Sequence, residues 1–70
     1  MEVEWVEGFK IKVTIDEAGA VVIGANQEGL LSLAKQLTAM AENAPGTHIH
    51  YDTYNSLEEG STELIITKTE

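Results

Sequence analysis

The chain has 70 residues, no cysteine, and twelve acidic residues against four lysines, which gives a formal net charge of −8. This length predicts a single small domain over residues 1–70, and a core of that size rarely supplies more than about 3–5 kcal/mol of net stability. The lack of cysteine excludes a disulfide and a thiolate metal site. With no arginine, the chain lacks the basic surface that binding to nucleic acid requires.

Two further features predict where the protein acts. The N-terminal residues are acidic and lack the apolar stretch of a secretory signal. No apolar run approaches the roughly 20 residues that cross a bilayer. The sequence therefore predicts a soluble, cytoplasmic protein with no membrane partner.

The first part of the chain predicts a hairpin. Residues 9–15 alternate between apolar and polar side chains, as a half-buried strand does. Asp16 favours the first position of a type I turn, and Gly19 accepts the left-handed conformation that closes it. Residues 20–23 are apolar on both faces, so we expect this returning strand inside the sheet rather than at its edge.

A helix is predicted to follow, beginning at Asn26, which is a favourable N-cap residue. It should end by Asn43 or Ala44, because Pro45 disfavours helical geometry in the residue before it. The face that packs on the sheet is predicted from the helical spacing of Leu30, Leu33, Ala34, Leu37, Met40 and Ala41. Gln36 lies off this face.

The last part of the chain predicts two more strands. Residues 47–52 alternate again, which places on one face His48, His50 and Asp52. A polar loop then covers residues 53–61, and residues 62–68 form a strand with an apolar centre.

The element order predicts an α+β fold, ββαββ, with one helix packed on a four-stranded, mainly antiparallel sheet. The second and fourth strands are the most apolar and should be central. The order first, second, fourth, third makes every neighbouring pair antiparallel and is favoured. The order second, first, third, fourth is also compatible with the sequence.

One cluster has metal-ligand character, because His48, His50 and Asp52 recur at every second residue of the predicted strand. Imidazole and carboxylate groups coordinate zinc or nickel. A structural zinc site normally needs four ligands, however, and the chain has no cysteine to complete it. We therefore predict no metal and no other cofactor. The alternative interpretation is an exposed face that meets solvent or a partner.

No catalytic group is predicted. Glu58 and Glu59 are adjacent in a turn, whereas paired acids that cleave glycosides need a cleft between them. The serines lie in no nucleophile-elbow pattern, and the glycines form neither a dinucleotide fingerprint nor a P-loop. Because no nucleophile, base and orienting group occur together, the sequence predicts a protein that is not an enzyme.

A polar patch that binds a protein partner is the favoured interpretation. Tyr54 lies in the polar loop, and exposed tyrosines often anchor interfaces. The other candidate partner-binding residues are His48, His50, Asp52, Glu58 and Glu59. The acidic charge favours a cationic partner. An ordinary solvated loop is the alternative.

Three blocks of sequence carry a resemblance to a known family. Residues 26–34 read Asn-Gln-Glu-Gly-Leu-Leu-Ser-Leu-Ala, residues 48–52 read His-Ile-His-Tyr-Asp, and residues 57–61 read Leu-Glu-Glu-Gly-Ser, followed by residues 63–66, Glu-Leu-Ile-Ile. In this order the blocks resemble the immunity protein 32 family of bacterial polymorphic toxin systems, over about the last two thirds of the chain. The resemblance implies a protein that binds a cognate toxin domain and blocks it.

The resulting hypothesis is an immunity-type protein that neutralises a toxin by stoichiometric binding through an acidic surface. Two alternatives belong to other classes. One is a small ligand- or metal-binding domain that uses His48, His50 and Asp52. The other is a structural or oligomerising module joined through an edge strand. The sequence leaves the oligomeric state and the chemistry of the toxin open.

Overall fold

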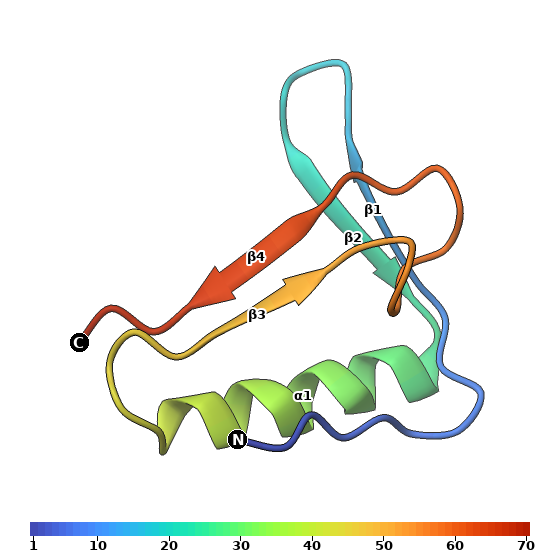
Figure 1. The fold of residues 1–70 in the computed structure, drawn as a ribbon. Helices are drawn as coiled ribbons and strands as arrows, with labels where there is room; N and C mark the ends of the chain where they lie inside the picture. The colour runs from blue at the N-terminus through green and yellow to red at the C-terminus, as the bar shows by residue number, and fades with distance from the viewer.

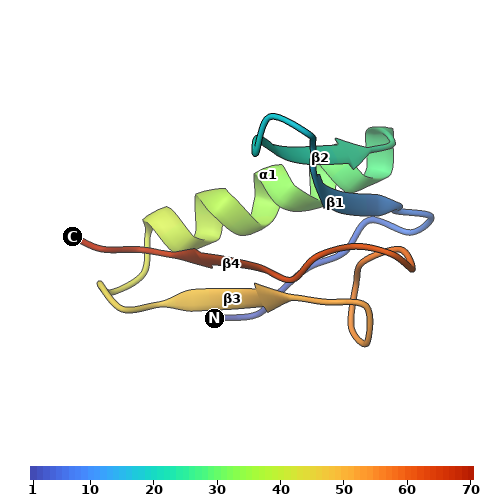
Figure 2. The same ribbon diagram turned by 90° about the horizontal axis from the view of Figure 1, so that it is seen from above.

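The computed structural model describes residues 1–70 and contains two antiparallel hairpins and one helix (Figure 1). The elements in chain order are β1 (Ile11–Ile15), β2 (Val21–Ala25), α1 (Gln27–Ala41), β3 (His48–Tyr51) and β4 (Leu64–Thr67). The β3–β4 hairpin lies over α1, the β1–β2 hairpin projects away from the helix, and the N-terminal segment runs along α1 (Figures 1 and 2). The predicted α+β class and element order are confirmed.

The turn of the first hairpin forms as predicted. The Asp16 carboxylate accepts the backbone N–H groups of Ala18 and Ala20, both at 2.9 Å. Gly19 has a φ of +86°, and its N–H donates to the backbone oxygen of Asp16 at 3.0 Å. Both residues therefore act through the turn chemistry that their types favour.

The four strands do not form one sheet. β1 pairs with β2 and β3 with β4, so the predicted four-stranded sheet and both predicted strand orders are wrong. The loop before β4 occupies the second edge of β1, where Glu58 N donates to Ile11 O and Thr62 N donates to Val13 O, both at 2.8 Å. Between these bonds, Val13 N donates to the Ser61 hydroxyl at 3.1 Å. A side chain takes the place of a backbone acceptor there, and no strand pairs with this edge of β1.

β2 and β4 are edge strands, which corrects the prediction that they are central. Each has one strand neighbour. In β2, Val21, Val22 and Ile23 are 59%, 44% and 42% exposed. In β4, Ile65 is exposed as well. The apolar run of β2 is uncovered because its hairpin extends beyond the helix (Figure 1).

The core lies between α1 and the inner faces of the two hairpins. Its buried apolar residues are Ile11, Val13, Leu33, Met40, Ile49, Tyr51 and Leu57. Trp5 stacks on Phe9 with ring centroids 4.3 Å apart and meets Tyr51 edge-on at 6.2 Å. The N-terminal segment thus closes one end of the core, although it contains no regular secondary structure.

α1 begins as predicted, because the side chain of Asn26 accepts the N–H of Gly29 at 2.8 Å. Its buried face differs from the predicted one and comprises Gly29, Ser32, Leu33, Gln36 and Met40. Leu30 and Leu37 are exposed instead. α1 also lacks the length and the apolar character of a helix that crosses a bilayer.

The buried face of α1 is rotated from the predicted one because of hydrogen bonds to the N-terminal segment. The backbone of the N-terminal segment needs partners, and α1 supplies them. Val6 N donates to the Ser32 hydroxyl at 2.8 Å, and the Gln36 amide donates to Glu4 O at 2.6 Å. The Tyr51 hydroxyl donates to the side-chain oxygen of Gln36 at 2.8 Å. These bonds allow two polar side chains to lie in the core.

Candidate partner-binding site

β3 presents two histidines on its outer face, because it turns Ile49 and Tyr51 into the core. The rings of His48 and His50 lie edge to face with centroids 5.1 Å apart. His48 Nδ1 lies 3.0 Å from the backbone oxygen of Gly46. A carbonyl oxygen only accepts hydrogen bonds, so Nδ1 is the donor and Nε2 faces away from this contact.

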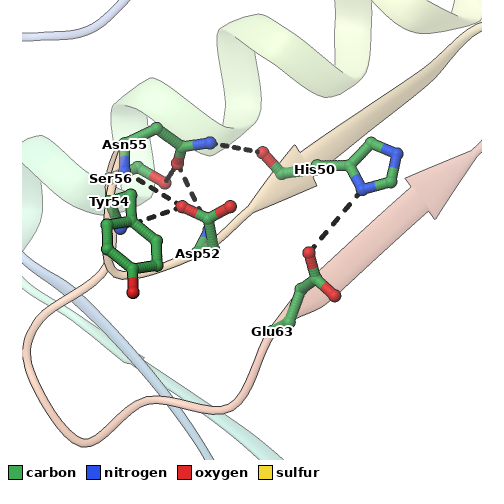
Figure 3. A network of polar contacts seen from close by, with 6 residues as sticks. All are labelled: His50, Asp52, Tyr54, Asn55, Ser56 and Glu63. Atoms are coloured by element: carbon green, nitrogen blue, oxygen red, sulfur yellow. Dashed lines mark hydrogen bonds and ion pairs between the residues drawn. The ribbon is translucent and has the colours of Figure 1, made fainter.

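The second imidazole has an acidic neighbour across the hairpin. His50 Nδ1 lies 3.7 Å from a carboxylate oxygen of Glu63, which comes just before β4 (Figure 3). Both side chains are about half exposed, so the pair orients two surface groups and adds little to stability. The ion pair exists only when His50 is protonated. Sequence reasoning missed Glu63, because only the pairing of β3 with β4 brings it to His50.

Asp52 does not join the two histidines. Its carboxylate accepts the backbone N–H groups of Tyr54 and Asn55 at 2.9 and 3.0 Å (Figure 3). The Asn55 amide in turn donates to the backbone oxygen of His50 at 3.0 Å. Asp52 therefore shapes the loop after β3 instead of extending its outer face. The structure brings together no group of three residues that would hold a metal ion.

The loop gathers three of the predicted residues around a hollow. Tyr54 is 98% exposed and lines, with Glu58 and Glu59, a shallow depression of about 340 Å³. Phe9 from the segment before β1 also lines it. The hydrogen bond from Glu58 N to β1 holds this part of the loop against the first hairpin. The result is a mostly polar, acidic hollow beside an exposed aromatic ring.

A second, mainly apolar cleft of about 180 Å³ adjoins the first. Its lining residues are Val3, Trp5, Ile49, His50 and Asn55. Asn55 borders both hollows. Sequence reasoning did not find Val3 and Trp5 as site residues, because no local pattern shows that the N-terminal segment packs beside β3.

The acidic side chains are largely free. Ten of the twelve are exposed and none is buried. The one contact at ion-pair distance joins His50 to Glu63, so no lysine neutralises a carboxylate. Lys12 reaches the loop at Gly60 without an ion pair, and Lys68 donates to the backbone oxygens of Ala41 and Asn43.

Residues 20–69 match the sequence model of a protein family described as Immunity protein 32. The chain belongs to the immunity protein 32 family. The match covers β2, α1, β3 and β4, which confirms the resemblance predicted for the last two thirds of the chain. Family membership indicates an immunity-type role, with a toxin protein as the partner. No significant match was found among curated proteins or among solved structures.

Proposed function

We propose that the protein neutralises a cognate bacterial toxin in the cytoplasm by binding it stoichiometrically, without catalysis. The binding surface, called here the β3–loop surface, comprises His48, His50, Asp52, Tyr54, Glu58 and Glu59. The observation that supports it most is the exposed tyrosine beside carboxylates that no lysine neutralises, in a member of an immunity family.

The distribution of charge supports this assignment. Residues 36–67 contain five acidic residues and no lysine. A surface of this kind attracts a basic cleft at long range and speeds its association. Toxins that act on nucleic acids carry such clefts, so the proposed partner surface is cationic.

The loop supports the assignment by its rigidity. The Asp52 carboxylate and the Asn55 amide hold the backbone on either side of Tyr54. The exposed ring is therefore presented on a preorganised loop, and little conformational entropy is lost when a partner covers it. In this proposal, Tyr54 is the anchor, Glu58 and Glu59 contact cationic groups, and Asp52 acts by shaping the loop.

The test uses the toxin domain encoded beside the gene for this chain. Titration calorimetry should give one protein per toxin domain, and the toxin activity should fall in parallel. Replacing the anchor, Tyr54→Ala, should weaken binding by about 30-fold or more, as for an interface hot spot. Raising the salt concentration should slow association strongly and dissociation little.

A matched pair of charge reversals separates a local contact from overall charge. Glu59→Lys changes the surface beside Tyr54, and Glu17→Lys makes the same charge change at the exposed tip of the β1–β2 hairpin. The first should weaken binding much more than the second. Equal losses would place the toxin elsewhere, and turnover of the toxin by the protein would refute stoichiometric neutralisation.

A further inference from the structure

β2 has a free hydrogen-bonding edge. At the two ends of the β1–β2 ladder, Asp16 N donates to Ala20 O and Asn26 N donates to Lys10 O. Hydrogen-bonded pairs alternate in an antiparallel ladder, so Val22 directs its backbone groups to β1. Val21 and Ile23 therefore direct their N–H and C=O groups to the open side, where β2 has no neighbour.

This edge lacks the features that usually keep a strand edge from pairing. It carries no lysine, no proline and no charged residue from Ala18 to Gln27. All five residues of β2 are in regular pairing with β1, so no bulge twists the edge away. Apolar side chains are exposed on both faces, with Val22 on one and Val21 and Ile23 on the other. Such an edge is a template for another strand.

We propose that β2 binds a second copy of this chain, in an antiparallel β2–β2 pair around a two-fold axis. With Val22 opposite Val22 of the partner subunit, Val21 lies opposite Ile23 of the partner subunit. Each cross-strand pair then joins β-branched side chains, and the two hairpins form one four-stranded sheet. The same edge serves both subunits, as a two-fold dimer requires.

The lack of charge on the β2 edge favours a second copy of the chain over the toxin as its binding partner. A cationic partner gains nothing electrostatic from an uncharged edge. Two copies of charge −8 repel each other at long range, and pairing through this uncharged edge places no like charges directly opposite each other. The loop of residues 58–62 lies along the opposite edge of the β1–β2 hairpin, on β1, so pairing through β2 leaves the β3–loop surface free.

The test measures the mass of the purified chain by sedimentation equilibrium from low to high micromolar concentration. We expect a shift from one to two chains, and the dimer fraction should rise with salt because screening removes repulsion. Val22→Lys places two ammonium groups opposite each other and should lower the association constant about tenfold or more. Circular dichroism checks that each variant is folded.

Two control variants make the outcome decisive. Ile65→Lys introduces the same charge at an exposed apolar position of β4, in the other sheet, and should leave dimerisation unchanged. Val22→Thr keeps a branched, uncharged side chain and should retain the dimer. A monomer at every concentration, or equal loss in Val22→Lys and Ile65→Lys, would overturn the proposal and leave the β2 edge to a different partner. Neither result bears on toxin binding.

Discussion

The two flanks of α1 differ in burial, and the polar flank is the buried one, which is the opposite of what their side chains suggest. The flank beside the N-terminal segment is polar, yet Ser32 and Gln36 are 0% and 1% exposed. The other flank carries Leu30 and Leu37, which are 56% and 43% exposed. Because the buried polar side-chain atoms all have hydrogen-bond partners, the availability of partners decides which flank is buried.

The difference shows that an irregular segment needs hydrogen-bond partners from the element on which it packs. The backbone of the N-terminal segment has no strand to pair with, and buried backbone groups left unpaired are costly. Ser32 and Gln36 supply the missing partners at Val6 and Glu4. The apolar flank of α1 offers no such groups, so the segment packs on the polar flank.

The largest expected effect comes from removing the amide at the centre of the polar flank. Gln36→Ala leaves the Tyr51 hydroxyl and Glu4 O without partners in the core, which should cost about 3 kcal/mol. Leu37→Ala on the apolar flank should cost about 0.5 kcal/mol or less, because its side chain is already exposed. Urea unfolding of both variants measures the difference. Equal losses would show that burial of apolar area, and not hydrogen bonding, distinguishes the flanks.

The next effect concerns the contact between α1 and β1. A Cβ at Gly29 would lie 2.6 Å from Lys10 O and 2.9 Å from a side-chain carbon of Ile11. Gly29→Ala should therefore destabilise the fold by about 2 kcal/mol, despite the higher helix propensity of alanine. Gly24→Ala is the matched control, since its nearest neighbour is 3.9 Å away. A stabilised Gly29→Ala variant in the same urea assay would contradict the close contact.

A smaller loss of folding stability is expected when Ser32, the other polar residue of the buried flank, is replaced. Ser32→Ala removes the acceptor of Val6 N–H and should cost about 1–2 kcal/mol. Thr38→Ala is its control, because the hydroxyls of Ser32 and Thr38 each donate to the backbone oxygen four residues earlier, but Thr38 is exposed. Thermal unfolding should show a lower Tm for the first variant alone. A similar Tm drop in both would assign the effect to the helix rather than to the N-terminal segment.

The last prediction concerns the titration of the core tyrosine, which leaves stability unchanged at neutral pH. Burial raises the pKa of the Tyr51 phenol above its ordinary value of 10.0. The unfolded chain thus loses this proton first as pH rises, so stability is intact below pH 10.0 and falls above it. Urea unfolding against pH should show this fall reduced in Tyr51→Phe and retained in Tyr54→Phe, whose ring is exposed. An equal pH dependence in the two variants would refute the assignment.

Features set by neighbouring residues were predictable from the sequence. The Asp16 turn, the Asn26 cap and the alternation of side chains along β3 were all predicted, because each depends on a pattern a few residues long. For the candidate site, the sequence predicted the exposed histidines and Tyr54. It did not predict that Asp52 turns into the loop or that Glu63 approaches His50.

The features that were missed depend on contacts between distant residues. The division into two sheets goes with a loop that bonds the second edge of β1, including a bond from Val13 to Ser61, 48 residues away. The buried face of α1 depends on Ser32 and Gln36 bonding residues 26 and 32 positions earlier. Apolar periodicity carries no information about such partners, because it describes which side chains avoid water and not which polar groups meet.

The sequence by itself determined the elements, their order, the acidic surface charge and the resemblance to an immunity family, since all of these are written in local pattern or composition. The tertiary structure alone decided which strands share a sheet, which flank of the helix enters the core, and which edge remains unpaired. The physical reason is that a backbone donor or acceptor must be satisfied where it is buried, and only the folded chain shows which group satisfies it.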